Sequence, residues 1–306
     1  MHGRLGVVRN LGASLTVVAL TLAGTACGGS PSAGQPGLIK VVAGENFWGS
    51  IAAQLGGSKA NVQSVVSDPN ADPHEYESST NDARAFADAQ LVILNGAGYD
   101  DWGQKLLGAN PSNHRQVVTV AQLLGKKAGD NPHFWYNPDY VTRIADLITS
   151  SYKTIDTADA AYFDQQRANF ASALKPYLDR IAEIRAKFSG KPVGSTESIF
   201  VYMANALSLD LISPPEFMQA VSEGNDPPAS AVASFQNQIT SGAIKVLVYN
   251  VQTATSITTN LKTMATANHI PVVGISETLQ PESATFQTWQ QSQLVNLENA
   301  LVAGTS

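Results

Sequence analysis

Two short segments of the chain each place a histidine directly after a proline. The segment Asp72–Glu77 contains His74, and the segment Asn131–Pro138 contains His133. Proline fixes its own φ and favours an extended residue before it, so we expect each imidazole on a stiff turn. Neutral imidazole is the commonest protein ligand of divalent transition metals, and two imidazoles need carboxylates or another histidine to complete a shell. Either the two turns share a metal site, or they are unrelated surface loops.

The elements that must position these histidines alternate between strand and helix. Apolar, β-branched runs predict strands at 38–43, 62–66, 91–95, 116–120, 192–196, 246–250 and 272–275. Helical spacing of apolar residues predicts helices at 47–55, 102–107, 139–152, 230–240 and 253–268, and one that follows an N-cap at Ser79 and ends at residue 89. Two further helices are expected, one that begins at about residue 200 and one that ends at about residue 301. This alternation is typical of parallel sheets covered by helices on both faces. We therefore predict an α/β fold with two lobes.

One long helical pattern separates the two halves. It runs from Thr157 to Phe188 and would extend about 45 Å at 1.5 Å per residue, which is enough to span two lobes. Pro176 lies inside it and is expected to kink the helix or split it in two. The predicted units are an N-terminal lobe at 38–156, a connecting helix at 157–190 and a C-terminal lobe at 191–306.

Four side chains that favour metals follow predicted strands. Open parallel sheets bind ligands beyond the carboxyl ends of their strands. His74 and His133 follow strands of the first half, and Glu197 and Glu277 follow strands of the second, as a site between two lobes requires. Alternatively, Glu197 is a carboxylate at a helix N-terminus and Glu277 a solvated loop acid. Two other histidines precede strands and are expected at the opposite, structural end: His114 and His269.

The N-terminus has the pattern of an export signal. Arg4 and Arg9 precede an uncharged apolar run that is too short for a membrane span, so we expect residues 1–26 to be a signal peptide. Cys27 is the only cysteine, and in an exported protein it has no internal disulfide partner. Residues 28–37 are rich in Gly, Ser and Pro, which is typical of a flexible tether.

The composition excludes disorder and argues against nucleic acid as a partner. The 306 residues are 43% hydrophobic, which is enough for one large core or two moderate ones. Removing residues 1–26, whose only charges are Arg4 and Arg9, takes the formal net charge from −6 to −8. An acidic body suits a cation as ligand.

These motifs together resemble the zinc and manganese receptors of bacterial ABC importers. The resemblance covers the mature chain and rests on the two Pro-His motifs, the acids at Glu197 and Glu277, and the early segment Asn46–Trp48. It implies two α/β lobes joined by a long helix, with the metal in the cleft between them. The sequence around Cys27 resembles a lipobox, although Gly24 replaces the usual branched aliphatic residue, so we expect Cys27 to be lipidated.

The resemblance implies His74, His133, Glu197 and Glu277 as metal ligands. Relatives have His or Glu at the third position and commonly Asp at the fourth, so the longer Glu277 leaves its coordination mode open. In the second motif, Asn residues stand at 131 and 137 where many relatives carry Asp, which we expect to weaken the orientation of His133. Two imidazoles with two carboxylates favour Mn²⁺ or Fe²⁺ over Zn²⁺, although Zn²⁺ binds such sites tightly as well. The resemblance permits either Zn²⁺ or Mn²⁺ as the transported ligand.

The implied function is not enzymatic. We expect a monomeric, extracytoplasmic lipoprotein, anchored to the cell membrane, that captures a divalent ion and delivers it to an ABC permease and its ATPase subunits. One alternative is an exported zinc-dependent hydrolase, which needs an open coordination position and a general base such as Glu75 or Glu77. The chain contains neither a His-Glu-x-x-His nor a Gly-x-Ser-x-Gly motif. Another alternative, an adhesin with the same fold, stays open.

Overall fold

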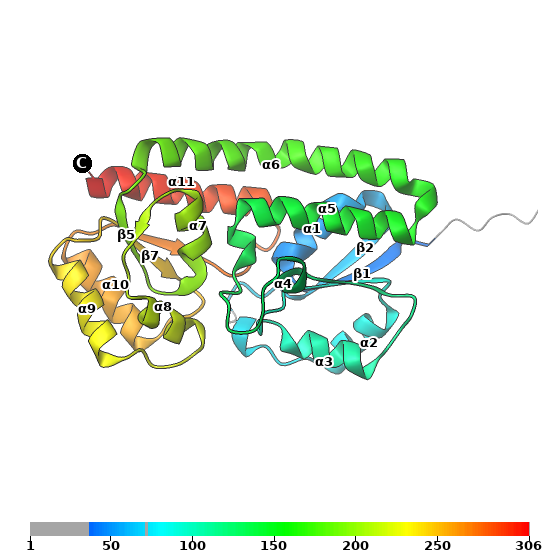
Figure 1. Cartoon of the computed structure of the whole chain (residues 1–306), viewed down its shortest axis with the longest axis horizontal. Coiled ribbons are helices and arrows are strands. Elements are labelled where there is room, and N and C mark those ends of the chain that lie inside the picture. The colour runs from blue at the N-terminus through cyan, green and yellow to red at the C-terminus, as the bar shows by residue number, and fades with distance from the viewer. Residues whose placement is uncertain (1–36, 71–72, 306) are drawn as a thin grey trace, which may run out of the picture. The chain divides into compact units, whose positions relative to one another are not determined.

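Two four-stranded sheets, each fully parallel, divide the chain into two lobes (Figure 1). The computed structural model describes residues 37–70 and 73–305, so the predicted signal peptide and Cys27 lie outside the described residues. The first sheet has the order β2-β1-β3-β4, with β1 Ile39–Glu45, β2 Ala60–Val66, β3 Leu91–Leu94 and β4 Gln116–Thr119. The second has the same order, β6-β5-β7-β8, with β5 Pro192–Ser195, β6 Asp210–Leu211, β7 Leu247–Asn250 and β8 Val272–Ile275. The predicted α/β fold with two parallel-sheet lobes is confirmed.

Helices connect the strands in both lobes. The first lobe contains α1 Asn46–Gly56, α2 Thr80–Asp88, α3 Asp101–Ala109, α4 Val120–Leu123 and α5 Pro138–Ile155. The second contains α7 Val201–Ala206, α8 Pro215–Ser222, α9 Ala229–Thr240, α10 Ser256–Ala267 and α11 Phe286–Thr305. The predicted N-cap Ser79 is confirmed, because its Oγ accepts the Asp82 amide while the Asp82 carboxylate accepts the Ser79 amide. Among the described residues, no helix is long and apolar enough to cross a membrane.

The largest hydrophobic core is shared by the two lobes. Alternate strand residues point to opposite faces of each sheet, so Val41 and Ile93 of the first lobe join this core together with Val248 of the second. The strand residues that alternate with these point to the opposite face and pack in smaller cores within one lobe. Val42 lies in such a core of the first lobe and Leu247 in one of the second. A large hinge motion between the lobes would expose part of the shared core to water, which opposes such motion.

Helix α6 (Ala160–Phe188) runs along both lobes and falls within the range expected for the connecting helix (Figure 1). It contacts α1 and α5 of the first lobe and α11 of the second. The helix continues through Pro176, so it is not split in two at this residue. Its buried side chains form one apolar stripe on both sides of the proline: Phe163, Phe170, Leu174, Tyr177, Ile181, Ile184 and Phe188. Burying this stripe outweighs the roughly 3 kcal/mol that an internal proline costs a helix.

Two elements of the second lobe have no counterpart in the sequence-based prediction. Strand β6 has two residues, too few for an alternating pattern to be recognised. Helix α8 follows Pro214 and begins at Pro215, and consecutive prolines are more typical of a loop than of a helix start.

Candidate functional site

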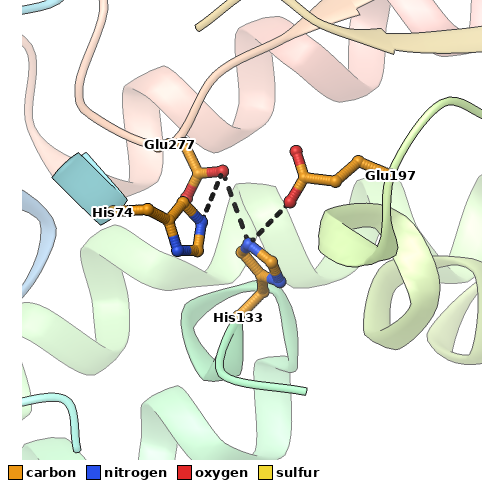
Figure 2. A group of neighbouring side chains, drawn as sticks. All are labelled: His74, His133, Glu197 and Glu277. Atoms are coloured by element: carbon orange, nitrogen blue, oxygen red, sulfur yellow. Dashed lines mark ion pairs between the residues drawn. The ribbon is translucent and has the colours of Figure 1, made fainter. Parts of the chain in front are cut away.

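The structure brings the four predicted residues together between the lobes (Figure 2). His74 lies on a 3-10 turn after β2, His133 directly precedes another such turn, Glu197 follows β5, and Glu277 follows β8. One ligand atom from each lies within 4.8 Å of every other. The side chain of His74 is 20% exposed, whereas the other three are fully buried. Two imidazoles and two carboxylates thus converge from two lobes.

The imidazoles face the carboxylates through their Nε2 atoms. His133 Nε2 lies 3.2 Å from Glu197 Oε1 and 3.4 Å from Glu277 Oε1, and His74 Nε2 lies 3.6 Å from Glu277 Oε1. The four convergent atoms form an N₂O₂ donor set of the kind that divalent transition metals accept. The structure places the residues; their role as metal ligands stays a prediction.

These contacts shift the pKa values of the buried groups. Burial lowers the pKa of His133, but the charge of Glu277 and hydrogen bonds to Glu197 and Glu277 outweigh it and raise this pKa to about 9. Burial likewise opposes protonation of His74, and Glu277 raises the His74 pKa above its ordinary value. Burial raises the pKa of Glu277, yet the charge and hydrogen bond of His133, followed by His74, hold it well below its usual range. At neutral pH, therefore, a proton on His133 balances the charge of Glu277.

Asn131 fixes the orientation of His133. Its Nδ2 donates to the Ser198 carbonyl at 2.7 Å, so its Oδ1 faces His133, where it accepts the backbone amide at 3.0 Å and lies 2.8 Å from Nδ1. An Nδ1–H donated to this oxygen leaves Nε2 directed at the carboxylates. The expectation that Asn131 weakens the orientation of His133 is therefore not met by the geometry. Asn137 has a different task, because its Oδ1 caps the N-terminus of α5.

The turn that carries His74 is held by both lobes. Within the first lobe, Tyr76 Oη donates to the Asp82 carboxylate at 2.8 Å at the start of α2. From the second lobe, Gln280 Nε2 donates at 2.9 Å to the carbonyl of Pro69, which follows the end of β2 in the sequence. Because Gln280 is three residues from Glu277, one segment of the second lobe both supplies a carboxylate and supports the loop of His74.

Three side chains that are not among the predicted ligands donate hydrogen bonds to the two carboxylates. Asn250 Nδ2 donates to Glu197 Oε2 and, at 2.7 Å, to Glu277 Oε1. Thr253 Oγ1 donates to Glu197 Oε2 at 2.8 Å, and Tyr99 Oη donates to Glu277 Oε2 at 2.7 Å. Asn250 is the last residue of a predicted strand, and ligands of parallel sheets lie beyond the carboxyl ends of the strands, so its position in the sequence indicates the same site. Tyr99 and Thr253 lie in loops whose direction the sequence does not specify.

A cavity of about 690 Å³ leads to the exposed edge of the cluster. Its lining includes His74, Tyr99 and Glu75 from the first lobe and Ser198 and Glu223 from the second. His74 is the one member of the cluster that lines it, in agreement with its partial exposure. The two other histidines among the described residues, His114 and His269, are exposed and do not belong to the cluster.

A second pair of buried acids lies in the first lobe. Glu45 ends β1 and is 1% exposed, and Asp100 is fully buried. Burial raises the pKa of Asp100 to about 6, although this carboxylate accepts the backbone amides of Asn95 and Gly96. Burial, and then the charge of Asp100, raises the pKa of Glu45 well above its ordinary value. Of the two acids, Glu45 is therefore the one whose proton is held by burial and by the neighbouring charge of Asp100.

Replacing Glu45 with glutamine is expected to stabilise the metal-free protein at pH 7.5. The unfolded chain ionises Glu45 above about pH 4.5, whereas the folded chain holds this proton to a higher pH, so stability falls as the pH rises above that value. Glutamine has the same shape and removes this dependence. Denaturant unfolding should show a gain at pH 7.5 that vanishes near pH 4. Glu298→Gln is the control, because Lys187 lowers the pKa of Glu298 and removing this carboxylate should not stabilise the protein. An equal gain in stability in both variants contradicts the prediction.

Comparison with known proteins identifies the family. The model of the family "Zinc-uptake complex component A periplasmic" (ZnuA) matches residues 41–300, which include all four residues of the cluster. The chain belongs to this family. The match spans both lobes and the connecting helix, so it covers the whole fold described above.

Similar curated proteins are named as metal ABC transporter or metal-binding lipoproteins. The substrate-binding lipoprotein FimA of Streptococcus parasanguinis is 27% identical over 205 residues, which cover 62% of this chain and 66% of FimA. The manganese ABC transporter substrate-binding lipoprotein PsaA of Streptococcus anginosus is 24% identical over 65% of this chain and 69% of its own length. The manganese-binding lipoprotein MntA of Halalkalibacterium halodurans is 26% identical over 46% of its length. The chain thus matches about two thirds of the first two and less than half of MntA.

Solved structures of ZnuA-type proteins share the fold. A crystal structure of ZnuA superposes with a TM-score of 0.68 at 19% identity and covers 87% of this chain and 99% of that one. The manganese-bound periplasmic metal-binding protein from Candidatus Liberibacter asiaticus gives a TM-score of 0.71 at 16% identity, with 85% and 98% covered. At these identities the likeness establishes the two-lobed fold.

Proposed function

We propose that this ZnuA-family protein is an extracytoplasmic receptor that captures one Zn²⁺ or Mn²⁺ ion and delivers it to an ABC permease with its ATPase subunits. The observation that carries the proposal is the cluster of His74, His133, Glu197 and Glu277, whose donor atoms converge within 4.8 Å between the lobes. Neutral imidazoles and carboxylates bind by ligand exchange, so the ion can be taken up and released without covalent chemistry.

The donor set favours a receptor over a hydrolase. Catalytic zinc sites use three protein ligands and keep a position open for water, whereas four side-chain donors fill a tetrahedral shell. His133, Glu197 and Glu277 are fully buried, so water has access only along the edge formed by His74. The protein therefore acts by binding rather than by catalysis.

The N-terminus serves as a membrane anchor in this proposal. Residues 1–26 direct export and are removed, Cys27 is lipidated, and residues 28–37 tether the lobes to the outer face of the cell membrane. The names of FimA, PsaA and MntA as lipoproteins support this arrangement. A tethered monomer would keep the captured ion close to the permease.

Elemental analysis of the full chain, purified in mild detergent without added metal, tests the proposal. After stripping, the protein is titrated with Zn²⁺ and Mn²⁺ beside the double variant His74→Ala, Glu277→Ala. We expect one tightly bound ion per chain and its loss in the double variant, with His114→Ala as a matched control that binds normally. Binding that persists in the double variant would show that the ion does not use this cluster.

A further inference from the structure

The Oε2 atoms of both carboxylates accept hydrogen bonds from neighbouring side chains. Glu197 Oε2 accepts from Asn250 and Thr253, which leaves Oε1 as the atom that faces His133. Glu277 Oε2 accepts from Tyr99, whereas Oε1, which also accepts from Asn250, faces both histidines. A hydrogen bond that holds one carboxylate oxygen away from the ion opposes binding of the ion through both oxygens. Here each carboxylate presents one oxygen.

Asn250 connects the two carboxylates. It is fully buried at the end of β7, and β7 lies between β5 and β8, the strands that precede Glu197 and Glu277. Its Oδ1 accepts the Gln252 amide at 3.1 Å, so the amide plane is fixed and both Nδ2 hydrogens point to carboxylate oxygens. Carboxylates accept only, so the nitrogen must face them.

We propose that Asn250 positions both carboxylates and, with Tyr99 and Thr253, restricts Glu197 and Glu277 to one oxygen each towards the ion. This inference rests on the proposed function and goes beyond it, because it assigns the coordination mode of the longer acid Glu277. Two imidazoles and two single oxygens make a four-coordinate site, which suits the tetrahedral preference of Zn²⁺. Mn²⁺ prefers six oxygen-rich ligands and would be left short of donors.

The chemistry of the asparagine side chain explains its place. Two buried carboxylates repel each other unless donors or a cation lie between them. An amide nitrogen carries two hydrogens and no charge, so it donates to one oxygen of each acid without repelling the arriving cation. A hydroxyl has one hydrogen and would serve only one acid, and a lysine in the same place would repel the ion.

Cobalt(II) reports the coordination number directly. Its visible d–d absorption is intense in a tetrahedral site, which has no centre of symmetry, and weak in five- or six-coordinate sites. The full chain in detergent is stripped and titrated with Co²⁺, and Zn²⁺ affinity is measured by competition with a chelating dye. The variants are Asn250→Leu and the double variant Tyr99→Phe, Thr253→Val. The matched control, Tyr152→Phe with Thr149→Val, removes the same atoms from buried hydrogen bonds of α5.

We expect intense Co²⁺ absorption in the wild type and in the control. The Tyr99, Thr253 double variant should lose severalfold of this intensity, because Glu277 Oε2 is freed, turns towards the ion and raises its coordination number, while Asn250 still holds Glu197 Oε2. Asn250→Leu should weaken binding of Co²⁺ and Zn²⁺ by about 10- to 100-fold, as is typical of losing a residue that orients a ligand.

The outcomes separate this inference from the proposed function. One bound ion with unchanged absorption and affinity in both variants, or equal changes in the control, overturns the inference and leaves the receptor function standing. A wild-type chain that binds neither Co²⁺ nor Zn²⁺ overturns both. If Asn250→Leu fails to fold, the Tyr99, Thr253 variant decides, because it removes two hydroxyls and keeps the packing.

Discussion

Replacing His133 with alanine is expected to weaken Zn²⁺ binding by at least about a hundredfold. His133 is fully buried, and its Nε2 is the atom that approaches both Glu197 and Glu277. Loss of a residue that only orients a ligand typically costs 10- to 100-fold in affinity, so removing a donor should cost no less. The cavity left by the imidazole admits water, which is a poorer ligand than a fixed side chain in this position.

The same substitution should destabilise the metal-free protein by about 3–5 kcal/mol, the usual cost of removing one partner from a buried ion pair. The protonated imidazole lies between two buried carboxylates, and alanine leaves them without a cation. Because the His133 pKa is raised to about 9, its contribution is fully present below about pH 6.5 and is lost as the pH rises through 9. The difference between the two proteins should therefore shrink in alkaline solution.

Two measurements check these effects. Competition against a chelating dye gives the Zn²⁺ affinity, and denaturant unfolding in the presence of a chelator gives the stability from pH 6 to pH 10. His114→Ala removes an exposed histidine and should change neither quantity. An affinity for Zn²⁺ within tenfold of the wild type would exclude His133 as a ligand, and a stability difference that grows with pH would contradict the charge balance proposed for the metal-free site.

The sequence predicted the location of the cluster because it depends on a general property of parallel sheets. Side chains that follow strands meet at one edge of the sheet, so His74, His133, Glu197 and Glu277 could be selected from strand ends alone. The fold class followed from the alternation of strands and helices, which the two sheets confirm. Both results rest on local patterns of apolar residues.

The remaining features depend on packing between distant segments. Tyr99 donates to Glu277 across 178 positions, and no local pattern records such a pairing. Pro176 predicts a kink or a split in α6, and the split is absent because the local rule for proline takes no account of the apolar stripe that packs against both lobes. Asn250 also ends a strand, but its amide is neither a carboxylate nor an imidazole, so a pattern of metal-ligating side chains does not include it.

Affinity for the ion is expected to rise about tenfold per pH unit between pH 7.5 and 8.5. With a pKa of about 9, His133 holds a proton over this range, and the ion must displace it to reach Nε2. Above pH 9 that proton is already lost, so the dependence should level off. At lower pH it should steepen, because His74, whose pKa Glu277 raises, becomes protonated as well. Acid thus releases the ion by protonating both imidazoles.

Zn²⁺ competition titrations at half-unit steps of pH measure this slope, once the protonation of the dye itself is taken into account. Calorimetry in two buffers with different ionisation enthalpies counts the protons released, and we expect close to one per ion at pH 8. His114→Ala should give the same slope, whereas His133→Ala should flatten it in the alkaline range, because the displaced proton belongs to His133. An affinity that does not change between pH 7.5 and 8.5 would mean that His133 is already deprotonated in the metal-free site. Glu197 and Glu277 would then lie close together without a protonated imidazole between them.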